Sequence, residues 1–334
     1  MSTATVPTEC PVPSTAAARL PRAWRWGAIA IAVAVAMGLP LVARSFVVFQ
    51  LTMALSYAIA ILGLDLLTGI SGQLSLGHSA FFGLGAYTTA ILMEQHGVPY
   101  LLALPAAAIV SFVFGFLFRL PALRLEGVYL ALATFALSVA TPQILKSTPL
   151  EPWTGGVQGI VVTRPNAPLG LPLSTDQWLY YLTLAILLGL GACALNLVRS
   201  RTGRALVALR DHPTAAVSMG VDAVRYKSVV FGVSAMYAGV AGALSALAVQ
   251  FVAPDSFTFA LSVALFLGLV VGGVGSMWGA LVGGLFILFV PNVAERLSKA
   301  LAGATYGAIL LAVIYAMPSG VAGLTRRILG RWKQ

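Results

Sequence analysis

Residues 46–67, FVVFQLTMALSYAIAILGLDLL, decide the fold class because Asp65 is the single charged side chain in this run. An apolar run of about 18 or more residues is long enough to cross the hydrocarbon core of a bilayer, about 30 Å thick, as one α-helix. The run therefore predicts a membrane-spanning helix.

Similar apolar runs recur along most of the 334 residues, of which 59% are hydrophobic and 9% are charged. A soluble domain carries about 25% charged residues. The predicted spans lie at 26–43, 46–67, 74–93, 98–118, 127–145, 178–198, 228–252, 257–274, 276–294 and 303–318. We expect an all-α, polytopic integral membrane helical bundle of about ten transmembrane helices.

The ends of the chain differ from this pattern. Residues 1–18, MSTATVPTECPVPSTAAA, are small and rich in Pro and Thr, a composition that cannot bury enough apolar surface to order itself. We expect a disordered cytoplasmic tail over 1–25, a transmembrane domain over 26–320 and a basic cytoplasmic tail over 321–334. Two cysteines, Cys10 and Cys193, are too few for a disulfide framework or a metal cage.

The basic residues predict the orientation. Ten crossings place both termini on one side, and cytoplasmic loops retain Lys and Arg. With the N-terminus inside, the side that alternation makes external holds five of the 20 Lys and Arg residues, which are Arg44, Lys146, Arg164, Arg296 and Lys299. This asymmetry predicts an N-in, C-in topology. Because the basic residues form short clusters between apolar runs, the net charge of +10 does not indicate a nucleic-acid partner.

The glycine-rich stretch 257–294 has two interpretations. Its glycines permit either two closely packed helices or one broken, re-entrant element. They are Gly272, Gly273, Gly275, Gly279, Gly283 and Gly284.

Chemically reactive groups are scarce within the predicted spans. Asp65 lies near the inner end of its span, where a cap or a side chain snorkelling to water is the favoured reading over a functional role. The sequence contains no GxxxxGK[ST] phosphate loop, no HExxH and no GxSxG. We therefore expect no enzyme activity and no metal site, and energy for any transport must come from another subunit.

The segment SGQLSLGHS at 71–79 is unusually polar for the start of an apolar span, with Gln73, Ser75, His78 and Ser79 among glycines. A lone histidine is often structural, bonded to a neighbouring helix. Polar, glycine-interrupted membrane segments also mark transport sites. Both a structural role and a pathway or helix-break role remain open here.

The longest inside loop is RSRTGRALVALRDHPTAAVSMGVDAVRYK at 199–227. Its apolar residues recur at helical offsets, and Pro213 and Gly220 divide it into two short helices, with Asp211 suited to cap the second. The recurring residues are Leu206, Leu209, Ala216 and Met219. From composition alone, the loop reads as an amphipathic helix held at anionic lipid by its arginines.

Several segments together resemble the branched-chain amino acid permease family of ABC importers. They are LGLDLLTGISGQLSLGHSAFFGLGAY at 62–87, LRLEGVYLALATFAL at 123–137, WTGGVQGI at 153–160, GRALVALRDHPTAAVSMGV at 203–221, SAMYAGVAGAL at 234–244 and GGVGSMWGALVGG at 272–284. Members of that family often carry a Glu in the Ala-Ala stretch of the loop. This chain has Thr214 and Val217 around it, so an ion pair to the ATPase is not implied at this place.

The resemblance implies a permease subunit of the bacterial inner membrane that translocates branched-chain or related amino acids. Its implied partners are a homologous second permease, two cytoplasmic ATPases that carry ATP and Mg, a periplasmic binding protein and the lipid bilayer, and no cofactor is expected in this chain. The implied ATPase contact comprises Arg204, Arg210, Asp211, Ala215, Ala216 and Gly220. The implied path comprises Gln73, Ser75, His78 and Ser79, with Thr154, Gly155 and Gly156 near the external mouth.

Two alternatives stay open at this point. The same machinery could carry urea, short amides or another small solute, because specificity in such systems rests largely on the binding protein. An ion-coupled carrier or a membrane scaffold is a different class, and the scarcity of intramembrane carboxylates argues against the carrier.

Overall fold

The computed structural model describes residues 34–41, 43–125, 127–165, 174–297, 302–317 and 320–323. The tail expected over 1–25 lies outside the described residues, as does all but the beginning of the tail expected over 321–334. The predicted first span, 26–43, is described from residue 34 and is helical over 34–41.

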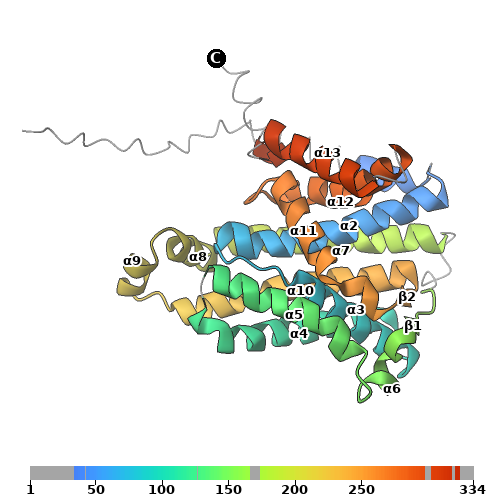
Figure 1. The fold of residues 1–334 in the computed structure, drawn as a ribbon, viewed down its shortest axis with the longest axis horizontal. Helices are drawn as coiled ribbons and strands as arrows, with labels where there is room; N and C mark the ends of the chain where they lie inside the picture. The colour runs from blue at the N-terminus through green and yellow to red at the C-terminus, as the bar shows by residue number, and fades with distance from the viewer. Residues whose placement is uncertain are drawn as a thin grey trace, which may run out of the picture.

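The described chain is predominantly helical (Figure 1). The longer helices are α2 (Ser45–Asp65), α3 (His78–Glu94), α4 (Tyr100–Arg119), α5 (Val128–Leu145), α7 (Thr175–Arg199), α8 (Arg201–Asp211), α10 (Ala223–Val249), α11 (Phe259–Gly272), α12 (Met277–Leu297) and α13 (Ala302–Ala316). The short elements are η1 (Leu66–Ile70), η2 (Pro121–Arg124), α6 (Glu151–Thr154), η3 (Gly156–Gln158), α9 (Pro213–Ser218) and η5 (Pro254–Phe257). Strands β1 (Ile160–Val161) and β2 (Phe251–Val252) pair antiparallel, with Ile160 opposite Val252.

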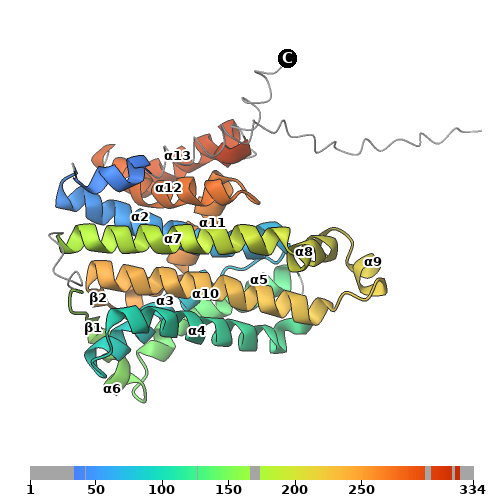
Figure 2. The same cartoon turned by 180° about the vertical axis from the view of Figure 1, so that it is seen from behind.

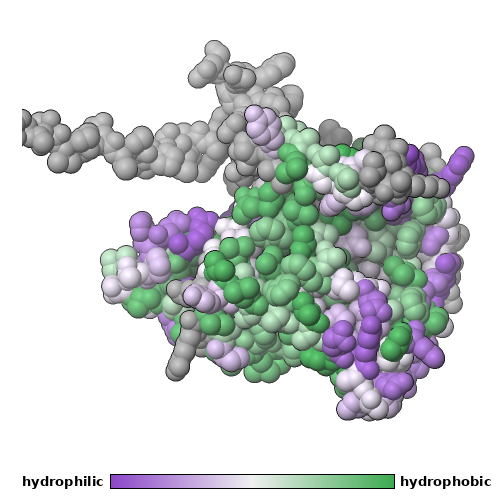
Figure 3. All heavy atoms as spheres, viewed as in Figure 1, coloured by the Kyte–Doolittle hydropathy of each residue, from purple (hydrophilic) through white to green (hydrophobic). Residues whose placement is uncertain are grey.

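Most of the long helices run roughly along one direction, with α11 crossing them in Figure 1, so the bundle has two ends (Figures 1 and 2). One end carries α8 and α9, and the other carries α6, β1 and β2. On the face shown in Figure 3, hydrophilic residues gather at these two ends and the surface between them is mostly hydrophobic. This apolar belt is the surface expected of a protein that crosses a bilayer.

The charge of the two ends agrees with the predicted orientation. The α8–α9 end holds the basic residues Arg119, Arg199, Arg201, Arg204, Arg210, Arg225 and Lys227. At the opposite end Lys146 pairs with Asp255 at 2.6 Å, and Glu94 accepts hydrogen bonds from the backbone and the hydroxyl of Thr163. An excess of Lys and Arg is typical of a cytoplasmic surface, so we treat the α8–α9 end as cytoplasmic.

Helix α10 lies at the centre of the bundle and packs against α2, α3, α4 and α7 (Figure 2). Nearly all of its residues from Val230 to Ala248 are buried. Its position follows from composition, since small residues allow neighbouring backbones to approach closely where lipid removes the hydrophobic drive for helix association. An aromatic cluster closes the α3–α4–α10 contact, with Phe81 edge-on to Phe231 at 5.7 Å between ring centroids.

Each predicted span from residue 46 onward contains a helix in the structure. Within the described ranges, six helices are long and apolar enough to cross a membrane, and Phe259–Gly272 and Gly303–Val313 are shorter apolar helices. The fold class is therefore confirmed, while the count of ten crossings stays a prediction. The span predicted at 74–93 begins later than expected, at His78, because the chain over 71–77 is not helical.

The glycine-rich stretch 257–294 forms two packed helices, α11 and α12. A Cβ atom at Gly272 would overlap the carbonyl oxygen of Gly279, so the two helices touch backbone to backbone near the turn that joins them. Helix α11 has 14 residues, about 21 Å at the α-helical rise, which is shorter than a full hydrocarbon core. The prediction of two closely packed helices is therefore confirmed, and one of them, α11, is shorter than a full crossing.

The contact of α3 with α10 gives a first testable prediction. A Cβ atom at Gly242 would overlap the carbonyl oxygen of Phe82, so Gly242→Ala must push the two helices apart. We expect a cost of about 1–3 kcal/mol, typical of overpacking, visible as a lower unfolding midpoint in detergent. Gly189→Ala on α7 is the control, since a Cβ there meets nothing within 4 Å. Equal midpoints for both variants would contradict this packing.

Candidate functional site

The chain breaks its helical path between α2 and α3. Helix α2 ends in the π-helical turn η1, and residues 71–77 then run without helix to His78. Gly72 has φ +70°, a conformation that glycine adopts without strain, and the Ser71 hydroxyl donates to the carbonyl of Leu67 at 2.8 Å. A helix break, one of the roles that the sequence left open for this polar segment, is therefore present.

This segment, 71–77, alternates between two sides. The side chains of Gln73 and Ser75 are buried, whereas Gly72 and Leu74 are exposed, Leu74 by 37%. The segment lies beside α5, because the backbone N–H of Leu76 donates to the hydroxyl of Thr134 in that helix at 2.9 Å. A non-helical stretch thus lies beside the membrane-spanning helices with one polar and buried edge.

Gln73 joins the cytoplasmic ends of several helices. Its amide nitrogen donates to the Ser71 hydroxyl at 2.8 Å and to the Lys227 carbonyl at 3.3 Å. Its amide oxygen accepts from Nε of Arg119 at 3.0 Å. Arg119 is only 1% exposed and also donates to the carbonyl of Ala122. Segment 71–77 is thereby tied to the end of α4 and the start of α10.

Arg119 was not among the residues that the sequence singled out. We expected it to be one of several cytoplasmic loop charges, yet the structure buries it beside Gln73. A single Arg at the last position of an apolar helix, directly before Leu120 and Pro121, was the available signal. A charge at such a place is expensive to bury and is retained where it has hydrogen-bond partners.

His78 holds α3 to α10 and, through one hydroxyl, to α2. Its Nδ1 lies 3.2 Å from the Ser75 hydroxyl and its Nε2 lies 2.8 Å from the Ser234 hydroxyl. The Ser234 hydroxyl donates its one hydrogen to the Gly63 carbonyl at 2.6 Å, so it accepts from His78. This network assigns the neutral tautomer with the proton on Nε2, and Ser75 then donates to Nδ1.

Ser79 makes the corresponding link to α11. The Ser262 hydroxyl donates to the Ser79 hydroxyl at 2.7 Å and accepts from the backbone N–H of Ser79 at 2.9 Å. Gln73, Ser75, His78 and Ser79 are all buried and bonded to protein groups in this structure. These four predicted path residues, which we call the polar layer, lie at the start of α3 and in the segment directly before it.

Removing His78 tests whether this layer holds the helices together. His78→Leu leaves the hydroxyl of Ser75 without its partner inside the bundle, and we expect a loss of about 1–3 kcal/mol, seen as a lower thermal midpoint in detergent. His96→Leu, at an exposed position after α3, should leave the midpoint unchanged. A His78→Leu protein as stable as wild type would show that the layer does not carry stability.

The predicted external site lies far from this layer. Thr154 donates to the carbonyls of Leu145 and Leu150 at 2.7 and 3.0 Å and accepts from the N–H of Gly156 at 3.3 Å. Gly155 and Gly156 both have positive φ, so the turn needs glycine there. The turn lies beside the end of α3, since the side chain of Gln95 donates to the backbone of α6. The 17 residues of α3, about 25 Å at the α-helical rise, separate the two groups.

The cytoplasmic loop forms the two short helices α8 and α9, as predicted. The Ser200 hydroxyl caps α8 by accepting from the N–H of Gly203 at 3.4 Å, and Pro213 begins α9. Leu206 and Leu209 are buried against the bundle. The prediction that Asp211 caps α9 is wrong, because the N-cap is His212 and the Asp211 carboxylate instead accepts from Nε of Arg210 at 2.8 Å. That hydrogen bond lowers the pKa of Asp211 below its ordinary value.

The predicted ATPase-contact residues of this loop do not all face outward. Arg204, Ala215 and Gly220 are exposed, and Arg204 donates to the Arg199 carbonyl at 3.2 Å. Ala216 is buried. The side chains of Arg210 and Asp211 are 39% and 49% exposed, and Nη1 of Arg210 also donates to the Gly69 carbonyl within the subunit.

Two apolar side chains on and beside α9 are prominently exposed. Val217 is 53% exposed and Met219 is 87% exposed. Met219 therefore does not continue the buried face to which its helical spacing from Ala216 had assigned it.

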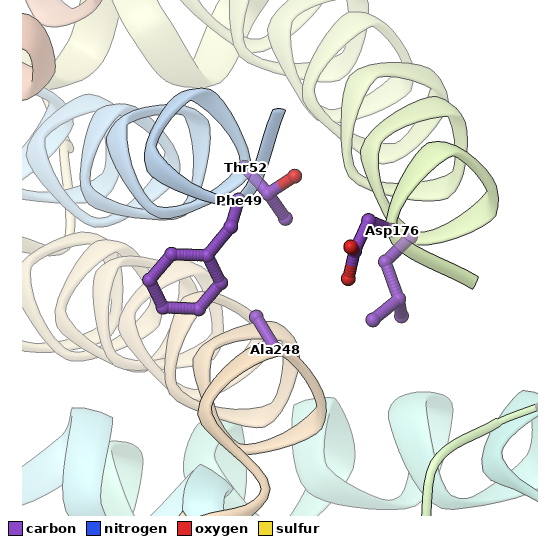
Figure 4. A pocket seen from close by; sticks show the side chains of 5 residues that line it. Phe49, Thr52, Asp176 and Ala248 are labelled. Atoms are coloured by element: carbon purple, nitrogen blue, oxygen red, sulfur yellow. The ribbon is translucent and has the colours of Figure 1, made fainter. Parts of the chain in front are cut away.

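One surface indentation lies apart from all these residues (Figure 4). It is lined by Phe49, Thr52, Asp176, Leu179 and Ala248, from the outer ends of α2, α7 and α10. Among the described residues, no group of three or more His, Cys, Asp or Glu side chains could hold a metal ion.

Comparison with known proteins bears directly on these features. The family described as "Branched-chain amino acid transport system / permease component" matches residues 46–317. The permease protein LivM of the high-affinity branched-chain amino acid transport system of Salmonella typhimurium is 33% identical over 82% of this chain and 69% of its own length. The LivM of Escherichia coli K12 is 32% identical over the same shares. LivH of Salmonella typhimurium is 25% identical over 81% of this chain and 92% of its own length.

No solved structure matches the chain. The matched region nevertheless runs from α2 into the end of α13 and so includes the polar layer, the external turn and the α8–α9 loop. The relatives are transport permeases and not enzymes, and the apolar helices make this a multi-pass membrane protein. The chain belongs to the family of permease components of branched-chain amino acid transport systems.

Proposed function

We propose that the chain is the membrane-spanning permease subunit of an ABC importer that moves branched-chain or related amino acids across the bacterial inner membrane. The match of residues 46–317 to the permease family carries this proposal. The names of LivM and LivH supply the substrate class, and the apolar belt between two polar ends supports the location. The permease domain is then 26–320, with 199–227 as its cytoplasmic coupling loop.

Energy enters through the α8–α9 loop in this proposal. Val217 and Met219 present apolar surface at the end of the molecule where a membrane protein meets the cytoplasm. Exposed apolar side chains rimmed by polar and basic ones are typical of a protein interface. We assign this surface to one of two partner ATPases, which would carry ATP and Mg. Arg204, Ala215 and Gly220 lie on the exposed part of the same loop.

Segment 71–77 supports a path at its outer edge. Irregular backbone at membrane depth is tolerated where protein covers it or where it lines a water-filled space. The exposed edge at Gly72 and Leu74 therefore needs one of these two environments. We propose that a second, homologous permease faces this edge. In this proposal, the path opens along the exposed edge of segment 71–77 when the hydrogen bonds of Gln73, Ser75, His78 and Ser79 break.

The relatives support a paired permease. Salmonella typhimurium and Escherichia coli K12 each have two permease proteins of this transport system, LivM and LivH, and both kinds match this chain. We propose that this chain pairs with a homologous subunit. A periplasmic binding protein would dock at the external end, where Thr154, Gly155 and Gly156 form their bonded turn.

Uptake by the complete complex tests the function. The chain is purified with its partner permease and ATPases, reconstituted in vesicles and supplied with its binding protein and labelled leucine. We expect uptake that requires ATP and does not respond to a proton gradient. Gradient-driven uptake without ATP would refute the ABC importer. ATP-driven uptake of urea or a short amide in place of leucine would retain the machinery and correct the substrate.

A further inference from the structure

The π-helical turn η1 is contacted by two separate cytoplasmic elements. From α8, Nη1 of Arg210 donates to the Gly69 carbonyl at 2.7 Å, across 141 positions of sequence. From the loop between α11 and α12, Gly275 lies against Gly69 of the turn, and its N–H donates at 2.6 Å to Oδ1 of Asp65, the last residue of α2 before the turn. Asp65 is only 3% exposed, so it is bonded inside the protein and does not reach toward water as the sequence had favoured.

The second contact of Arg210 is with the segment that follows the turn. A Cβ atom at Gly72 would lie 2.6 Å from Cγ and 3.5 Å from Cβ of Arg210. The arginine side chain therefore lies along Gly72 while its guanidinium reaches Gly69. One side chain of α8 touches both the π-helical turn and the start of segment 71–77.

Physical chemistry favours a cation at this place. The carbonyls at the C-terminal end of a helix lack intrahelical partners and carry partial negative charge. Arg210 supplies a charged donor to one of them and a second donor to Asp211. A π-helical turn is rare and is found mostly at functional sites, since its extra residue per turn gives the helix a local irregularity.

We infer that Arg210 is a positioning residue that passes the movement of α8 to the turn 66–70, and through it to segment 71–77 and the polar layer. This inference rests on the proposed function, since α8 moves only when a partner ATPase acts on the α8–α9 loop. It assigns Arg210, whose side chain is 39% exposed, to the link between the loop and the path through its contacts with Gly69 and Gly72, and leaves contact with the ATPase to the exposed Val217 and Met219. Asp65 holds the same turn against the α11–α12 loop and provides the opposing contact.

Loss of the link should separate ATP hydrolysis from transport. In the reconstituted complex, we expect Arg210→Ala to lower leucine uptake per ATP hydrolysed by about tenfold, within the range typical of coupling between two sites. Assembly with the ATPases and the basal hydrolysis rate should stay at the wild-type level. Arg201→Ala is the matched control, because Arg201 is an exposed residue of the same helix.

A disulfide between positions 72 and 210 can replace the contact of Arg210 with segment 71–77. Recovery of coupling by this disulfide would show that Arg210 positions the segment and does not only stabilise the fold. A Cβ atom at position 72 would lie 3.5 Å from Cβ of residue 210, at the lower end of the range of disulfides, so Gly72→Cys with Arg210→Cys should form one. The single Gly72→Cys variant measures the cost of a side chain at φ +70°. Cys10 and Cys193 are first replaced by serine. Under reducing conditions the pair should be uncoupled, and oxidation should restore the uptake per ATP, whereas the single cysteine variants should not respond.

Two results would overturn the inference. One is a wild-type ratio of uptake to hydrolysis in Arg210→Ala. The other is a cross-link that blocks uptake, since that would mean that α8 and segment 71–77 must move relative to one another. Absence of ATP-driven uptake in the wild-type complex is a separate result, and it would refute the proposed function instead.

Discussion

Replacing Val217 and Met219 together by aspartate is expected to abolish most ATP-driven uptake, with a fall of at least about tenfold. Both side chains are largely exposed, Val217 by 53% and Met219 by 87%, at the end of the molecule that carries α8 and α9. In an interface, burying an unpaired carboxylate costs several kcal/mol, and about 1.4 kcal/mol already changes binding tenfold. The variant should therefore insert and fold but lose its ATPases.

The measurement is copurification of the ATPases with the permease, followed by uptake in vesicles. Val217→Ile with Met219→Leu is the matched control, because it keeps apolar side chains of similar size at both positions. Its copurification and uptake should stay close to wild type. If the aspartate variant retains its ATPases, the docking surface lies elsewhere on the cytoplasmic end and the exposed apolar pair contacts lipid.

The apolar runs predicted the helices well because crossing a bilayer imposes one strict requirement on composition and length. The runs at 98–118 and 127–145 became α4 and α5 with ends shifted by only a few residues. The break before His78 was also readable, since glycines and short polar side chains favour leaving a helix. What composition cannot predict is how far one helix lies from another.

For this reason, the sequence did not predict which side chains pair across the bundle. His78 and Ser234 are 156 positions apart, and their contact depends on the way α3 packs on α10. The loop shows the same limit, since Ala216 and Met219 share a spacing but only Ala216 is buried. Helical periodicity predicts a common face, and it cannot say where the short helix α9 ends and turns away.

The burial of Arg119 is the contact that the sequence predicted least well, and it leads to the second prediction with a large effect. Its guanidinium is buried and bonded to the amide oxygen of Gln73 at 3.0 Å. Arg119→Met keeps the length and the apolar stem but leaves the Gln73 oxygen and the Ala122 carbonyl without this donor. Breaking a buried charged hydrogen-bond network costs roughly 2–5 kcal/mol, so we expect a clearly lower thermal midpoint. Leucine uptake should fall with it.

The control for this change is Arg225→Met, near the start of α10. Arg225 is an exposed arginine at the same cytoplasmic end, so its replacement removes one charge without opening a buried network. We expect the midpoint and the uptake of that variant to match wild type. Arg119→Lys should recover only part of the loss, because an ammonium group cannot reproduce the fixed fork of donors of a guanidinium.

A double-mutant cycle then decides whether Arg119 acts through Gln73. Gln73→Leu removes the acceptor of Arg119 and also the donors to Ser71 and Lys227. If the two residues form one network, the double variant should cost less than the sum of the single variants, by about 0.5–3 kcal/mol. Additive costs would mean that Arg119 stabilises the end of α4 on its own. In that case segment 71–77 is held at its cytoplasmic end by Lys227 and Arg210, and the uptake defect of Arg119→Met should follow stability alone.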